Sequence, residues 1–404
     1  RRAQTDAGEG AWHRVATFVM RRPWPIAISV VAVLVLLGTP FLGAEFGLPD
    51  DRVLPENVSS RQVQDRIRAD FSSQEASALS VVAVEAGPAG RERDAVVDLY
   101  AANLSAIDGV ARVDASTGSY LDGERIAPPS AASARFSGAD GTWLSVVPAV
   151  EPVSSEGERL AHDVRSVSAP FETLVTGRSA ELVDSKAGIF GRLPLAAGII
   201  AVVTFVLLFL MTGSVLVPLK AIVMNLLSLS ATFGALVWIF QEGNLSDLLG
   251  FTATGTLDTS MPILMFCIAF GLSMDYEVFL LSRIKEEYDR TGDNEASVAM
   301  GLERTGRIVT AAAALLAVVF IAFATSGITF IKMFGIGMAL AVIMDATLIR
   351  AALVPAFMRL AGNANWWAPA PLRRLHDRVG LRETPEPIAM PAPSVEPVET
   401  EGAA

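Results

Sequence analysis

An aspartate lies in the middle of an apolar stretch, where a charge is costly. Asp275 interrupts the run 261–281, which is long enough to cross a hydrocarbon core of about 30 Å at about 1.5 Å per residue. An ionisable side chain there costs roughly 2.5–3.5 kcal/mol on insertion scales. Such a residue is either paired for structure or kept to handle protons or ions. Because Asp345 lies centrally in a second apolar run, 331–358, the pattern favours proton handling.

The residue after Asp275 carries a phenol. Neighbouring side chains on an α-helix point about 100° apart, so Asp275 and Tyr276 cannot pair with each other and each needs a partner on another helix. This arrangement predicts a relay in which Asp275 accepts the proton and Tyr276 acts as a hydrogen-bonding gate. The alternatives are a neutral carboxyl in a structural hydrogen bond and an ordinary buried tyrosine with a satisfied hydroxyl.

Other polar and small residues surround this predicted relay. Asp345 either joins the same network or pairs with Arg350, and coupling and structural roles stay equally open. Five residues is about 140° around an α-helix, so a partner from another helix is expected for Asp345. We expect Glu277 on a solvated or interfacial face. Small residues let membrane helices approach closely, which predicts close packing at Gly271, Ser273, Gly335 and Gly337.

The composition is typical of an integral membrane protein with a soluble part. Of 404 residues, 51% are hydrophobic and 19% charged, compared with about 25% charged in soluble domains. Although the net charge is −11, the basic residues cluster beside the apolar runs, so nucleic acid is not an expected partner. One cysteine, Cys267, and three scattered histidines predict neither disulfides nor a metal site. Because the sequence contains no catalytic constellation and no Walker loop, we expect neither an enzyme nor a cofactor. We expect the energy for its activity to come from a gradient and not from hydrolysis.

Six apolar runs have the length of a membrane span, at 24–43, 194–212, 216–240, 261–282, 308–326 and 331–358. Lysines and arginines in the short loops place both termini on the cytoplasmic side of the membrane and 45–190 outside. Lys332 is the exception, and we expect it to snorkel to the interface. Because the chain begins with Arg1 instead of Met, we expect it to be part of a longer polypeptide. Our predicted division is 1–23 lead-in, 24–43 first span, 44–192 extracytoplasmic domain, 193–360 five-helix bundle, 361–382 juxtamembrane segment and 383–404 tail.

The outer region has the pattern of an α+β domain. Strands are predicted at 79–85, 110–114, 143–150 and 173–176, with helices at 91–107 and 156–167. The order βαββαβ is that of the ferredoxin-like split βαβ unit. A helix over 61–71 would link the first span to this domain, and 181–191 would lead back into the membrane. The segment 115–142 is predicted to be a loop, and Asn225 to bond across helices. The tail, rich in proline and glutamate, is predicted to be disordered.

Long stretches of the chain resemble the MMPL family, large membrane transporters of the RND superfamily. They are LFLMTGSVLVPLKAIVMNLLSLSATFGALVWIFQEG (208–243), FGLSMDYEVFLLSRIKEEY (270–288), GLERTGRIVTAAA (301–313) and FIKMFGIGMALAVIMDATLIRAALVPAFMRLAGNANWWAPAPLRRL (330–375). The resemblance implies one lone span, a porter subdomain and five clustered spans. It also implies proton-driven export of lipids or glycolipids from the inner membrane towards the cell envelope.

Polypeptides of this family contain two such units, and this chain resembles the second. The resemblance therefore implies a missing N-terminal unit as a partner, besides the membrane, protons and a lipid substrate. It also implies that Asp275 and Tyr276 form one of two Asp-Tyr pairs that meet at the proton relay. The alternatives are a protein-translocation accessory similar to SecD and SecF, a non-transporting scaffold or lipid sensor, and a drug or siderophore exporter.

Overall fold

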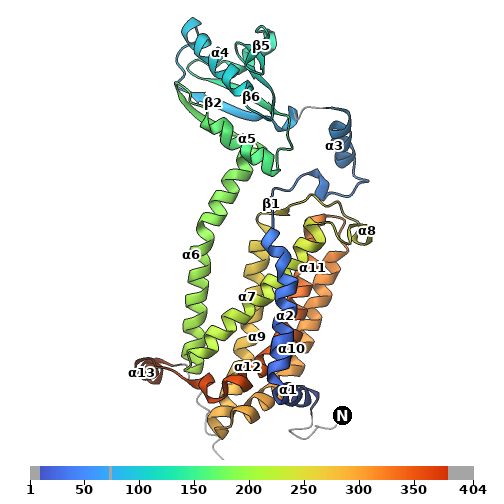
Figure 1. Cartoon of the computed structure of the whole chain (residues 1–404), viewed down its shortest axis with the longest axis vertical. Coiled ribbons are helices and arrows are strands. Elements are labelled where there is room, and N and C mark those ends of the chain that lie inside the picture. Colours follow the sequence, from blue (N-terminus) through green and yellow to red (C-terminus); the bar gives the residue numbers. More distant parts are fainter. Residues whose placement is uncertain (1–9, 72–74, 381–404) are drawn as a thin grey trace, which may run out of the picture.

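The molecule is elongated, with a bundle of long helices at one end and a sheet domain at the other (Figure 1). The computed structural model describes residues 10–71 and 75–380, so the predicted disordered tail lies outside the described residues. Within these residues, six helical stretches are long and apolar enough to cross a membrane; five contain a predicted run whole, and the fifth ends at Ala324, two residues before the end of the predicted run 308–326. They are Pro23–Gly43, Arg178–Thr212, Leu216–Gln241, Met261–Thr291, Asn294–Ala324 and Thr329–Trp366.

The helices of these stretches pack closely where glycine allows it. The stretches contain α2 (Pro23–Gly38), α6 (Arg178–Thr212), α7 (Leu216–Leu236), α9 (Met261–Thr291), α10 (Asn294–Ala324), α11 (Thr329–Met344) and α12 (Val354–Ala361). A Cβ on Gly335 of α11 would lie 2.5 Å from the carbonyl oxygen of Phe320 on α10. A Cβ on Gly337 would lie 2.1 Å from Cε of Met265 on α9. Close packing at both glycines is therefore confirmed. At Gly335 a larger side chain would push the backbones of α10 and α11 apart, and at Gly337 it would displace the end of the Met265 side chain.

Helix α6 runs without interruption from the sheet domain to the far end of the bundle. Its first turns bury Ala180 and Leu182, so the segment predicted to lead into the membrane is the start of one helix of 35 residues. It ends at Gly213, whose φ of +67° suits a residue without a Cβ. Most of its apolar length stands clear of the other helices (Figure 1).

The sheet domain contains a six-stranded antiparallel sheet in the order β5-β4-β3-β6-β2-β7. Four strands lie where they are predicted, and α4 (Arg91–Ser105) and α5 (Ser155–Ser166) are the two predicted helices. The strands are β2 (Leu79–Val84), β3 (Val110–Ala115), β4 (Gly118–Leu121), β5 (Glu124–Ala127), β6 (Thr142–Pro148) and β7 (Glu172–Thr176).

The prediction of a loop over 115–142 is wrong in part, because β4 and β5 form a hairpin there. Asp122 and Gly123 make its two-residue turn, with φ of +50° and +83°. An Asp-Gly pair at positive φ matches the right-handed twist of paired strands, so this dipeptide was an available signal. The remainder of the segment holds a short helix, Ala131–Phe136.

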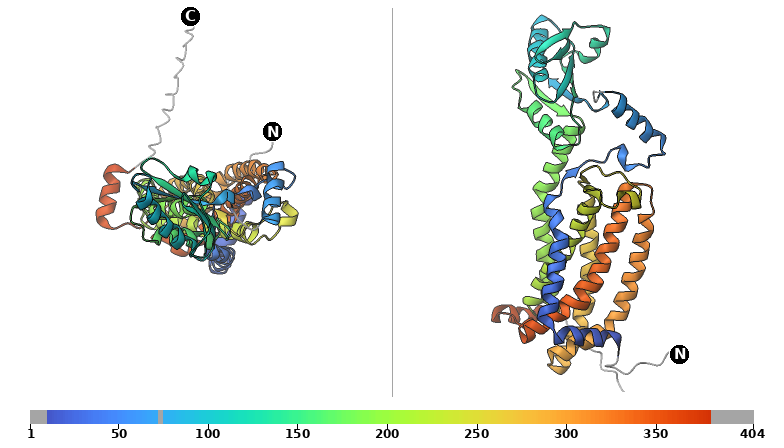
Figure 2. Two further views of the ribbon diagram at one scale, coloured as in Figure 1. Left: turned by 90° about the horizontal axis from the view of Figure 1, so that it is seen from above. Right: turned by 45° about the vertical axis from the view of Figure 1, so that its right-hand side comes forward.

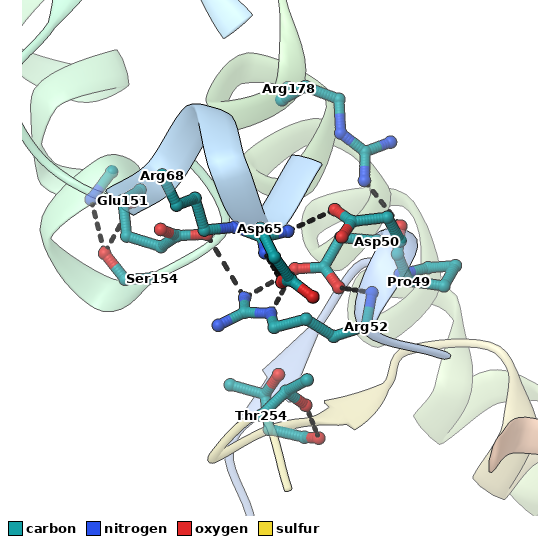
Figure 3. A network of polar contacts seen from close by, with 12 residues as sticks. Pro49, Asp50, Arg52, Asp65, Arg68, Glu151, Ser154, Arg178 and Thr254 are labelled. Atoms are coloured by element: carbon teal, nitrogen blue, oxygen red, sulfur yellow. Dashed lines mark hydrogen bonds and ion pairs between the residues drawn. The ribbon is translucent and has the colours of Figure 1, made fainter. Parts of the chain in front are cut away.

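A charged network joins the sheet domain to the bundle (Figure 3). It follows β1 (Phe46–Gly47), which pairs in parallel with β8 (Leu257–Asp258), and it includes α3 (Ser59–Asp70), the predicted linking helix. The Arg52 guanidinium donates to Asp50 at 2.7 Å and to Glu151 before α5 at 3.1 Å. Arg178, the first residue of α6, donates to the carbonyl of Pro49 at 2.6 Å. The start of α6 is therefore tied to the strand-like segment that leaves the first span.

Three short helices complete the ends of the bundle. Helix α1 (Ala11–Arg21) precedes the first span, and α13 (Ala370–Val379) follows the last; both lie at the end away from the sheet domain (Figure 1). Helix α8 (Ser246–Leu249) lies at the opposite end. There Lys332 is buried and its ammonium donates to the carbonyls of Leu249 and Gly250. The ammonium of Lys332 therefore reaches the loop at that end of the bundle, where carbonyl oxygens satisfy it, and its snorkelling to the membrane interface stays a prediction.

Candidate functional site: a buried charge network between spanning helices

Asp345 and Arg350 form an ion pair in the core of the bundle. The Arg350 Nε lies 2.8 Å from Asp345 Oδ2, and Arg350 also donates to the carbonyl oxygen of Ser273 on α9. The Ser273 hydroxyl in turn donates to Asp345 Oδ1 at 2.8 Å. Because Asp345 and Arg350 are 8% and 3% exposed, both charges are compensated by each other and by α9 instead of by water.

The pairing of Asp345 with Arg350 depends on a change of helix type. The segment Asp345–Leu353 between α11 and α12 is a π-helix, in which backbone hydrogen bonds join residues five apart. Residues i and i+5 then lie on the same side of the helix. The expectation that an arginine five residues away is badly placed was wrong for this reason, since it assumed α-helical spacing. The expected contact from another helix is present as well, through Ser273.

Tyr276 faces the same network. The Arg350 guanidinium carbon lies 5.3 Å from the centre of the Tyr276 ring, within the range of a cation–π contact. Beside it is a cavity of about 10 Å³, lined by Ser273, Tyr276, Asp345 and Asn225 among others. This space is enough for about one water molecule. The Nδ2 of Asn225 is buried and unbonded among the described residues, so the predicted interhelical bond of this amide is not made.

Asp275 points away from this network. It is exposed on α9, and no hydrogen bond or ion pair reaches it from residues 10–71 or 75–380. Its neighbours on the same face, Leu264, Cys267, Gly271 and Val278, are exposed too. The structure thus brings Tyr276, Ser273 and Asp345 together and leaves Asp275 apart from them. It lies on an uncovered stripe of a helix long enough to span a membrane.

Close packing predicted at Gly271 is not made by the described residues of this chain. A Cβ on Gly271 would meet no atom within 4 Å, because its face of α9 is the exposed stripe. Ser273 does lie at a helix contact, where it is 8% exposed and bonded to Asp345. The two small residues, only two positions apart, therefore face opposite environments.

A second pair of buried charges was missed by the reasoning from sequence. Lys220 on α7 and Glu277 on α9 are each 4% exposed and close enough to interact electrostatically. Neither Lys220 Nζ nor Glu277 Oε1 has a hydrogen-bond partner among the described residues. Placing Glu277 on a solvated face was wrong: it follows Ser273 by four residues, so it shares the buried face of α9. That spacing was the signal available in the sequence.

Polar side chains lie in two groups inside an otherwise apolar bundle. Asp345, Tyr276 and Asn225 line one cavity, and Lys220 and Glu277 form the second pair of buried charges. Buried ionisable groups in a membrane bundle are costly, and they mark ion or proton pathways more often than stabilising pairs. No cluster of metal-ligating side chains occurs in the part of the chain that the structure describes.

A multi-span membrane protein with a sheet domain outside the bundle and ionisable residues inside it is the class that this geometry defines. The family model of the MMPL family matches residues 52–389. The chain therefore belongs to the MMPL family.

Several curated relatives are similar over nearly the whole chain. It is 40% identical over 381 residues to the putative membrane protein SCO6666 of Streptomyces coelicolor, covering 94% of this chain and 50% of that protein. It is 32% identical over 402 residues to the trehalose monomycolate exporter MmpL3 of Mycolicibacterium smegmatis, covering 99% of this chain and 39% of that protein. It is 31% identical over 366 residues to the membrane protein YdfJ of Bacillus subtilis, covering 90% of this chain and 48% of that protein. The chain thus spans about half, or less, of each of these relatives.

Proposed function

We propose that this chain is the C-terminal unit of a transporter that uses the proton motive force to export lipids or glycolipids across the inner membrane. Membership of the family and similarity to a protein named as a trehalose monomycolate exporter support the substrate class. The observation that carries proton coupling is Asp275, an exposed carboxyl that has no partner among residues 10–71 and 75–380 and lies on a helix of membrane-spanning length. Exposure of such a group to lipid would cost roughly 2.5–3.5 kcal/mol. A further surface must therefore cover it.

In this proposal the N-terminal unit of the full polypeptide packs on the exposed stripe of α9. Gly271, four residues before Asp275, lets the backbone of that unit come close to the carboxyl. Asp275 would then exchange its proton in each cycle, while Tyr276, on another side of α9, acts as a hydrogen-bonding gate beside Asp345 and Arg350. Protonation removes a charge between the two units and changes how their helices pack. Helix α6, tied at Arg178 to the outer network, transmits this change to the sheet domain.

The same proposal fixes the orientation and the division of the chain. The sheet domain lies outside the cytoplasm as a ferredoxin-like porter subdomain, and the spans follow the one-plus-five order. Both termini lie on the cytoplasmic side. The distribution of lysine and arginine supports this arrangement, as does the placement of α1 and α13 at the end opposite the sheet domain (Figure 1).

Replacing Asp275 with Asn in the full-length protein tests the relay. Asn keeps the shape of Asp but cannot carry the proton, so we expect export to be lost while membrane abundance stays normal. Asp289→Asn, on the same helix but at its exposed end, is the matched control and should export normally. Normal export by Asp275→Asn at normal abundance would eliminate the relay. Loss of abundance alone would assign Asp275 a structural role.

A further inference from the structure

Helix α13 has two distinct faces. At 100° per residue, Leu372, Leu375 and Val379 fall within a stripe about 60° wide, and the opposite face carries the arginines Arg373, Arg374 and Arg378. Leu375 and Val379 are 48% and 58% exposed, so the described residues leave much of this stripe uncovered. An amphipathic helix with arginines on its polar face is typical of a membrane interface.

The connection to the last span holds α13 at the level where that span ends. Only residues 367–369 separate Trp366 from the start of α13, and so short a segment reaches at most about 14 Å. The helix lies across the long axis and projects sideways from the bundle (Figures 1 and 2). Trp367, in this connection, is 59% exposed. Tryptophans are enriched where membrane meets water, which agrees with this level.

One edge of α13 is fixed on the bundle. The ring of His376 lies 6.0 Å from the ring of Phe209 on α6, with the planes 74° apart. A Cβ on Gly213, between α6 and α7, would lie 3.0 Å from the His376 ring. Contact with this turn orients the helix, so that Leu375 and Val379 cannot rotate into the core of the bundle.

We propose that α13 lies in the membrane interface and binds anionic phospholipid headgroups, with Leu375 and Val379 among the acyl chains. Charge complementarity selects these lipids, because three arginines face a single acidic residue on the helix, Asp377. Guanidinium groups bind phosphate oxygens through two parallel hydrogen bonds, so phosphate headgroups suit them well. This binding would hold the α6–α7 turn at the membrane surface, and it does not depend on the proposed transport.

Fluorescence in lipid nanodiscs tests the proposal on the full-length protein. Val379→Cys, with other cysteines replaced by serine, is labelled with a polarity-sensitive fluorophore. Nanodiscs contain phosphatidylcholine alone or mixed with phosphatidylglycerol. We expect a blue shift of the emission and several-fold stronger quenching by spin-labelled lipid in the anionic discs. High salt should reverse part of this difference, because it screens charges at a surface.

Two sets of arginine variants separate lipid binding from a general effect of charge. Replacing Arg373, Arg374 and Arg378 with Gln should abolish the difference between the two kinds of disc. The same change at Arg290, Arg307 and Arg359, which are exposed and lie outside α13, should leave it intact. Emission typical of water in both kinds of disc would overturn the proposal, as would a difference that survives the first set.

A segment of this chain could occupy the arginines instead of lipid. Residues 383–401 contain five glutamates and no lysine or arginine. Truncation after Arg382 distinguishes the two occupants. If the lipid response of the label is unchanged by truncation, the membrane is the partner. If truncation alone shifts the emission in phosphatidylcholine discs, the acidic segment covers the helix and the proposal fails.

Discussion

Arg350→Met tests whether the ion pair inside the bundle holds the helices together. The substitution introduces an apolar side chain of similar length. It leaves Asp345, which is 8% exposed, with the Ser273 hydroxyl as its one donor among the described residues. Removing one partner of a buried ion pair costs about 3–5 kcal/mol, since the other charge remains in a medium of low dielectric constant. The second bond of Arg350, to the Ser273 carbonyl, is lost as well. We therefore expect a clear fall in thermal stability and in membrane abundance.

The double variant Asp345→Asn/Arg350→Met makes this reasoning quantitative. Replacing both charges by neutral groups removes the uncompensated ion, so the double variant should be more stable than Arg350→Met alone. Equilibrium unfolding of the purified protein in mild detergent measures all four members of the cycle. We expect a coupling energy of about 1–3 kcal/mol between the two positions. If the two single losses simply add, within about 0.5 kcal/mol, the ion pair does not contribute as the geometry indicates.

Three further predictions follow from other contacts. Lys220→Met should lower the free energy of unfolding by about 3–5 kcal/mol, because it leaves the buried Glu277 without its opposite charge. Adding Glu277→Gln should restore much of this loss, and equal melting points for the single and double variants would contradict the pairing. Gly306→Ala should lower the free energy of unfolding by about 1–3 kcal/mol, because the new Cβ would lie 2.5 Å from the ring of Trp12. Adding Trp12→Leu, whose side chain is smaller, should relieve the clash and raise the melting point again. Burial, followed by the hydrogen bond to Asp98, raises the pKa of Tyr120 to about 12 from 10.0, so the phenol stays neutral in the folded domain. Its contribution to stability is complete below pH 10 and is lost as the pH rises towards about 12. Tyr120→Phe should flatten that part of the stability profile measured by circular dichroism, and an unchanged slope would argue against the shift.

The spans and most of the sheet domain could be predicted because each depends on local pattern. A run of about 20 apolar residues or an alternation of β-branched side chains is visible in any short window. The hairpin at Asp122-Gly123 was equally local, and its dipeptide signal was overlooked among the small residues of 115–142.

The candidate site depended on geometry that no α-helical wheel contains. A wheel at 100° per residue separates Asp345 from Arg350, whereas the π-helical segment brings them together. The same wheel correctly turns Asp275 and Tyr276 apart. It does not tell which of them faces the bundle, since both sides of α9 are apolar enough to be buried.

By itself, the sequence determined that two carboxyls lie within apolar runs and that the chain resembles a family of membrane transporters, because residue type and spacing carry that information. Tertiary structure decided their partners. The π-helical turn placed Asp345 beside Arg350, and contact of that segment with α9 added Ser273 and Tyr276 and left Asp275 on the outer stripe. The physical reason is that burying a charge requires compensating groups, and only the local type of helix and the packing of helices distant in sequence set which groups those are.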